Sequence, residues 1–147
     1  MTRHYNTLWR DQETYCRYWL SVNGEDWTPY WGLGKSLLEK GDYPAATTVL
    51  ENGFRTNPYS HLILTDLGYA YFIAGRFEDS LRAYQVALGL DPNHTLAYHR
   101  KGELFLATGD YREAELALLS ALELNPSAPP SYELLMEVHN RVREQNQ

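Results

Sequence analysis

One unit of sequence recurs in this chain of 147 residues, three times and without an insertion. The interval is 34 residues, and it relates two glycine columns, a proline column and an aromatic column: Gly34, Gly68 and Gly102; Gly41, Gly75 and Gly109; Pro58, Pro92 and Pro126; Tyr43, Phe77 and Tyr111. Small and large apolar residues keep the same interval: Ala46, Ser80 and Ala114; Gly53, Ala87 and Ala121; Leu37, Tyr71 and Phe105; Leu50, Tyr84 and Leu118. Such a period predicts stacked copies of one supersecondary unit.

Each copy can be interpreted as two antiparallel helices. The glycine column that begins at Gly41 ends the first helix, because glycine tolerates the left-handed conformation of a helix cap. The prolines end the second helix, because proline cannot continue one. The column that begins at Gly34 lies inside the first helix, where glycine costs about 1 kcal/mol relative to alanine. A cost repeated three times predicts close contact between the two helices, with the small residues of the second helix facing the glycine.

This pattern resembles the tetratricopeptide repeat (TPR) family, whose 34-residue unit carries Gly, Tyr, Ala, Phe and Pro at these spacings. The resemblance covers residues 27–128 and is clearest in "LGYAYFIAGRFEDSLRAYQVALGLDP", residues 67–92. It implies an all-α fold, a right-handed α-solenoid of three helical hairpins at residues 27–60, 61–94 and 95–128. We expect residues 1–147 to form a single domain of this kind.

The two ends are expected to be helices that flank the repeats. Residues 129–147 are predicted as a capping helix with Ser131 as its N-cap, since a repeat array needs a terminal element with one polar face. Its packed face is expected to hold Tyr132, Leu135, His139 and Val142.

For residues 1–26, a helix with Leu8, Tyr15, Trp19 and Val22 on one face is expected, with Cys16 as a buried small apolar residue. Two interpretations of this helix remain open: it covers the edge of the first repeat, or it carries a self-association surface.

Charge and composition exclude several classes of function. The formal net charge is −6 and no segment concentrates Lys or Arg, so a nucleic-acid partner is not expected. The N-terminus has no apolar signal-peptide core, and no run approaches 18 apolar residues, so no membrane partner is expected either. Cys16 is the single cysteine, which excludes an intramolecular disulfide and fits a cytoplasmic protein.

No catalytic or metal-binding constellation is apparent. The chain lacks HExxH, a phosphate loop, a nucleophile elbow and CxxC. Its five histidines show no metal-ligand spacing along the chain: His4, His61, His94, His99 and His139. We therefore expect no enzyme activity, no cofactor and no metal.

The resemblance to TPR proteins places a concave groove on the first helix of each pair. The residues expected to line it are Trp31, Lys35 and Leu38; Leu62, Thr65, Asp66, Tyr69, Phe72 and Ile73; and Leu96, His99, Arg100, Glu103 and Leu106. Core packing uses other positions of these helices, so the rings of Trp31, Tyr69 and Phe72 are expected to have no structural role. They are the main sequence evidence for a bound partner.

The groove chemistry selects among ligands of this family. One class of TPR domains binds the acidic C-termini of chaperones through Lys and Asn residues, and the matching positions here hold Trp31, Lys35, Asp66, Leu96 and Arg100. Arg100 alone agrees with that pattern and Asp66 would repel a carboxylate, so this ligand is excluded. An extended or helical peptide with apolar anchors fits better.

Two functions follow from these expectations. The first is an adaptor, or chaperone-like protein, that binds a peptide segment of a partner; the size and repeat number also look like those of the secretion chaperones of bacterial type III systems. The alternative is a scaffold that forms homo-oligomers through residues 1–26 or through an open repeat edge.

Overall fold

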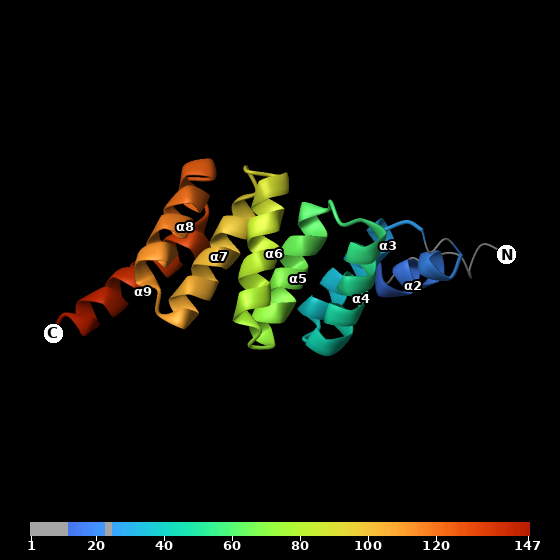
Figure 1. Cartoon of the computed structure of the whole chain (residues 1–147), viewed down its shortest axis with the longest axis horizontal. Coiled ribbons are helices and arrows are strands. Elements are labelled where there is room, and N and C mark those ends of the chain that lie inside the picture. The colour runs from blue at the N-terminus through green and yellow to red at the C-terminus, as the bar shows by residue number, and fades with distance from the viewer. Residues whose placement is uncertain (1–11, 23–24) are drawn as a thin grey trace.

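The computed structural model describes residues 12–22 and 25–147, and these residues form helices and no strand. The helices are α2 (Gln12–Val22), α3 (Thr28–Glu39), α4 (Tyr43–Thr56), α5 (His61–Ile73), α6 (Phe77–Leu90), α7 (Thr95–Thr108), α8 (Tyr111–Leu124) and α9 (Pro129–Gln145). They stack in chain order into an elongated body, with α2 and α9 at opposite ends (Figure 1). The predicted all-α solenoid of helical hairpins is confirmed.

The hairpins are α3–α4, α5–α6 and α7–α8, and each packs against the next. Successive first helices also contact one another, α3 with α5, α5 with α7, and α7 with α9, more than successive second helices do. A stack whose first helices lie closer together curves toward them. The concave side is therefore the side of α3, α5 and α7, where the groove was expected.

The glycine caps have the conformation that the sequence predicted. Gly41, Gly75 and Gly109 have φ angles of 80°, 75° and 83°, in the left-handed region. After α3, the Gly41 N–H donates to the Leu38 carbonyl at 3.0 Å, and the Asp42 N–H donates to the Leu37 carbonyl at 2.9 Å. These two bonds define a Schellman cap, which only a residue free to adopt positive φ closes without strain.

The glycines inside the first helices mark the predicted close contacts. A Cβ atom added to Gly68 would lie 2.5 Å from Cε1 of Tyr84, and one added to Gly102 would lie 2.6 Å from Cγ of Leu118. At Gly34 the added atom would collide with Leu50. The predicted close contact is confirmed, but its partner was predicted wrongly: the large residue of each second helix, and not a small one, occupies the space that the missing side chain leaves.

The flanking helix α2 packs against the first hairpin. Cys16 is buried, as predicted, in a cluster with Leu33 and Leu37, and Leu20 packs beside it. On the face expected to hold Tyr15, Trp19 and Val22, Val22 is 62% exposed and Tyr15 is also exposed. Leu8 lies outside the described residues.

Helix α9 covers the last hairpin with a face that agrees only in part with the predicted one: Leu135 is buried as predicted. Its buried residues are Ser131, Leu135 and Val138, whereas Tyr132 is 61% exposed. The predicted N-cap was also wrong, because α9 begins at Pro129 with Ala128 before it, so Ser131 lies inside the first turn. Proline is tolerated in a first turn, where its missing N–H would have no helical partner.

Among the described helices, none is both long enough and apolar enough to cross a membrane.

Candidate functional site

The structure places the expected groove residues on α3, α5 and α7. Twelve of those expected to line the groove are partly or fully exposed: Trp31, Lys35, Leu38, Leu62, Asp66, Tyr69, Phe72, Ile73, Leu96, His99, Arg100 and Glu103. Leu106 is partly buried and packs against the cluster beneath α9. Thr65 does not belong to this surface: it is 1% exposed, and its hydroxyl donates to the His61 carbonyl at 2.8 Å. No peptide can reach it.

A hydrogen bond joins the first two repeats across the groove. The indole N–H of Trp31 donates to Oδ2 of Asp66 at 2.8 Å. Trp31 also packs against a core cluster that includes Ile63 and Leu67. Burial raises the pKa of Asp66 above its ordinary value, although the bond from Trp31 and the charges of Lys35 and Arg100 act in the opposite direction. Asp66 is thus a partly desolvated carboxyl group whose main partner is an indole.

A second set of contacts joins repeats two and three. The Arg100 guanidinium lies over the Tyr69 ring, 3.9 Å from its centroid, which is the geometry of a cation–π interaction. Nη1 of Arg100 also donates to Oε2 of Glu103 at 2.7 Å. One cation is therefore shared between a ring of α5 and a carboxylate of its own helix.

The contacts continue from α7 to α9. Nδ1 of His99 lies 2.9 Å from the Ser131 hydroxyl, and Nε2 of His99 lies 3.7 Å from Oε1 of Glu103. Burial lowers the pKa of His99 below its ordinary value, Glu103 raises it and Arg100 lowers it. A neutral imidazole carries one proton, on either of its two nitrogens. Nδ1 of His99 can therefore donate to the Ser131 hydroxyl or accept from it.

These contacts correct one expectation from the sequence. Trp31 and Tyr69 do have structural partners, because they hold Asp66 and Arg100, respectively. Phe72 also contacts rings, 6.4 Å from Tyr69 and 5.9 Å from Phe77 between centroids. The polar groups of the groove are thus largely engaged with each other, and its accessible apolar surface includes Ile73 and Leu96, which are 41% and 43% exposed.

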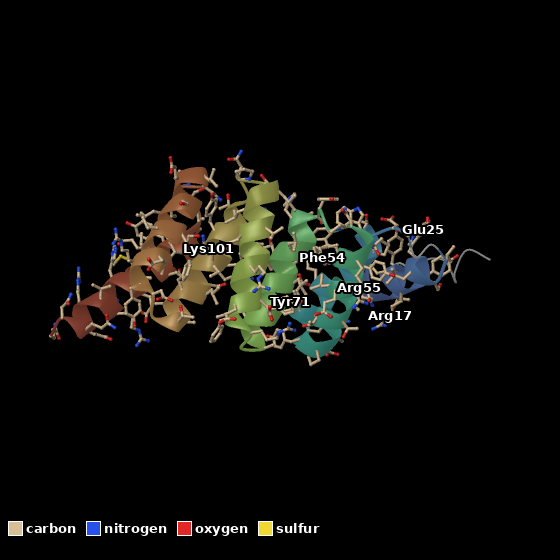
Figure 2. The ribbon with its side chains drawn as sticks, viewed as in Figure 1. Arg17, Glu25, Phe54, Arg55, Tyr71 and Lys101 are labelled. Atoms are coloured by element: carbon tan, nitrogen blue, oxygen red, sulfur yellow. The ribbon has the colours of Figure 1, made fainter. Side chains whose placement is uncertain are left out.

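A hollow on another side of the hairpins was not predicted from the sequence. Its volume is about 440 Å³, and it is lined by α4, α5 and α6, with Phe54, Leu67 and Val86 among its apolar residues. Figure 2 shows Phe54, Arg55 and Tyr71 together where these three helices meet. The Tyr71 hydroxyl donates to Oε1 of Glu51 at 2.9 Å. Tyr71 belongs to a repeating column, and an equivalent hollow of about 190 Å³ lies one repeat later, where Phe105 takes the place of Tyr71.

A smaller hollow of about 300 Å³ lies between α2 and α3. Tyr15, Cys16 and Trp19 line it from α2, and Trp31 lines it from α3. The same tryptophan therefore borders both the groove and the contact with the N-terminal helix.

Two family models of the tetratricopeptide repeat match the chain, one over residues 32–95 and the other over residues 71–137. The chain belongs to the tetratricopeptide repeat family. TPR domains are protein-interaction modules, so the family supports a binding function rather than catalysis.

Curated relatives share modest identity with this TPR chain. The Hsp70-Hsp90 organising protein of Plasmodium falciparum is 24% identical over 119 residues, which cover 81% of this chain and 47% of that protein. Tetratricopeptide repeat protein 21B of Homo sapiens is 31% identical over 104 residues, 71% of this chain and 8% of that protein. The chain thus spans half or less of the length of these relatives.

Solved TPR domains have the same fold. The first TPR domain of human RPAP3 aligns with a TM-score of 0.75 at 23% identity, covering 80% of this chain and 92% of that domain. The first TPR of Spaghetti (RPAP3), bound to the HSP90 peptide SRMEEVD, aligns with a TM-score of 0.70 at 24% identity, covering 75% and 87%. The Sgt2 TPR domain of Aspergillus fumigatus aligns at 0.74 and 19% identity, covering 80% and 79%.

Proposed function

We propose that this TPR chain is an adaptor that binds a peptide segment of a partner protein along α3, α5 and α7. The observation that carries the proposal is that the polar and the apolar side chains of this face differ in whether they already have partners. Asp66, Arg100 and Glu103 already bond to neighbours within the groove, whereas the apolar side chains of Ile73 and Leu96 stay exposed. Apolar surface left on a concave face is what an extended or helical peptide with apolar anchors covers.

The same geometry disfavours an acidic peptide terminus, the ligand that the Spaghetti domain holds as SRMEEVD. A carboxylate entering between α3 and α7 would meet Asp66, and Arg100 already pairs with Glu103 at 2.7 Å. Lys35 lies 5.6 Å from the Trp31 ring and is the remaining exposed cation at the matched positions. Because Lys35 is a single cation and Asp66 would repel the peptide's carboxylates, we expect the chain to bind SRMEEVD weakly.

Peptide selection tests the proposal directly. Peptides selected on the full chain from a random display library would be titrated against the wild type, against Tyr69→Ala and against Leu96→Ala. The matched control is Leu116→Ala, which removes a 58% exposed leucine from α8, outside the groove.

We expect the two groove variants to weaken binding about tenfold or more, as truncation of an anchor contact does, and the control to bind as the wild type. Peptides that bind both groove variants with unchanged affinity, or selected sequences that are uniformly acidic at the C-terminus, would refute the assignment. Far-UV circular dichroism checks that each variant keeps its helices.

The exposed apolar residues of α9 support a second candidate function, self-assembly. Tyr132 and Met136 are 61% and 48% exposed, one turn apart on the last helix of the stack. At the other end, Tyr18 and Val22 are 51% and 62% exposed on α2. Stacking of one copy on the next would cover both surfaces. Sedimentation of the wild type and of Met136→Glu tests it: a monomer in both excludes this function.

A further inference from the structure

Three side chains at helix ends converge between the second and third repeats. His61 is the first residue of α5, Asp91 follows the last residue of α6, and His94 precedes the first residue of α7. These helix ends lie along one long edge of the stack, the upper edge in Figure 1. Nε2 of His61 lies 3.6 Å from Oδ2 of Asp91, and Nδ1 of His94 lies 4.0 Å from the same oxygen.

The sequence conceals this cluster because its histidines are almost one full repeat apart. A metal site within one helix or loop has its ligands a few residues apart in the sequence. His61 and His94 are too far apart in the sequence to meet that criterion. Stacking brings equivalent ends of successive repeats together, so the two rings meet with their centroids 4.8 Å apart. The relevant spacing in a solenoid is the repeat length rather than one helical turn.

The local hydrogen bonds orient these groups. The Asn93 N–H donates to Oδ1 of Asp91 at 3.1 Å, so the loop holds one carboxylate oxygen and leaves Oδ2 facing both rings. The distances from Oδ2 to the rings are too long for hydrogen bonds. Nε2 of His94 is buried without a hydrogen-bond partner. The three groups therefore face one another without direct hydrogen bonds between the carboxylate and the rings.

We propose that His61, Asp91 and His94 bind a divalent transition-metal ion, with Zn²⁺ as the best fit. Two imidazoles and a carboxylate are ligands of Zn²⁺, and three protein ligands leave one tetrahedral position for water. Metal–ligand bonds of about 2.0–2.2 Å place tetrahedral ligand atoms about 3.4 Å apart. The candidate ligand atoms all lie within 4.8 Å of one another, so small side-chain rotations close the site.

Exposure and charge are compatible with this ion. The side chains of His61 and Asp91 are each 34% exposed, which leaves a route of entry and room to rotate, while that of His94 is 15% exposed. Burial lowers the pKa of His94, His61 lowers it further and Asp91 raises it. A bound ion would tie the start of α5 to the end of α6 and the start of α7.

Calorimetric titration of Zn²⁺ into the tag-free full chain, after removal of metals with EDTA, tests the proposal. We expect one equivalent to bind, and the affinity to fall at least tenfold in His61→Ala, His94→Ala and Asp91→Asn, since even residues that only support a ligand contribute that much. The matched control is His139→Ala, because His139 faces a carboxylate, Glu115, with 2.9 Å between Nε2 and Oε1, and that pair lies on α8 and α9.

NMR of the wild type gives a measurement that does not depend on the folding of a variant. Zn²⁺ should shift the ring C–H signals of His61 and His94 and leave those of His139 unchanged. Co²⁺ in the same site should give the intense visible absorption of a four-coordinate ion. Absence of saturable binding, binding that survives a His61→Ala/His94→Ala double substitution, or an equal loss in His139→Ala would overturn the proposal.

Discussion

Substitution of Gly68 by alanine tests the packing that defines the hairpin. In a solvent-exposed helix the change would stabilise the chain by about 1 kcal/mol, because alanine has the higher helix propensity. At this position the new Cβ atom would lie 2.5 Å from Cε1 and 2.8 Å from Cδ1 of Tyr84. Carbon atoms in contact prefer about 3.5–4.0 Å. The ring would therefore have to retreat by about 1 Å.

Tyr84 cannot retreat freely, because it is 0% exposed and packed on all sides. Overpacking of a core costs about 1–3 kcal/mol, which exceeds the gain in propensity. We expect a net loss of up to about 2 kcal/mol in the free energy of unfolding. For a domain of this size, that loss lowers Tm by up to about 8 °C.

The matched control lies on the same helix as Tyr84. A Cβ atom added to Gly89 meets nothing within 4 Å, so Gly89→Ala should stabilise the chain by up to about 1 kcal/mol. Urea unfolding followed by circular dichroism measures both variants. In a Tyr84→Leu background the cost of Gly68→Ala should shrink, since the smaller side chain leaves room for the methyl group. A Gly68→Ala protein as stable as the Gly89→Ala protein would refute the steric account of the glycine column.

Two further predictions concern the bond between Trp31 and Asp66. Trp31→Phe keeps the ring and removes the donor, so it should destabilise the chain by about 1.5–3 kcal/mol in urea unfolding at neutral pH, the range for a hydrogen bond to a charged group; an unchanged midpoint would contradict this. Because the pKa of Asp66 is raised in the folded state, its contribution to stability is greatest below the unfolded-state pKa of about 3.9 and is lost as the pH rises through the folded pKa. Asp66→Asn should therefore gain stability relative to the wild type as the pH rises above about 3.9, and a stability difference that does not change with pH would contradict the raised pKa.

The sequence determined the fold through local rules that repeat. A helix needs a residue that adopts positive φ at its end, and Gly41, Gly75 and Gly109 supply it at equal intervals. Two helices that pack closely need a missing side chain at their crossing, and Gly34, Gly68 and Gly102 supply that. Each requirement involves neighbours within one repeat, so the pattern in the chain states it directly.

The tertiary structure alone decided which side chains meet across repeats. The period identified positions on the concave helices, and it gave no indication that Trp31 bonds to Asp66 or that Arg100 lies over Tyr69. The face of α9 was predicted only in part, because Tyr132 and Leu135 are both apolar and packing against α8 decides that Leu135 is the buried one. The cluster of His61, Asp91 and His94 has the same origin, since its members meet only when two hairpins stack. Contacts within a repeat follow from short-range stereochemistry, whereas contacts between repeats depend on the angle and rotation at which whole hairpins pack, and no local pattern specifies those.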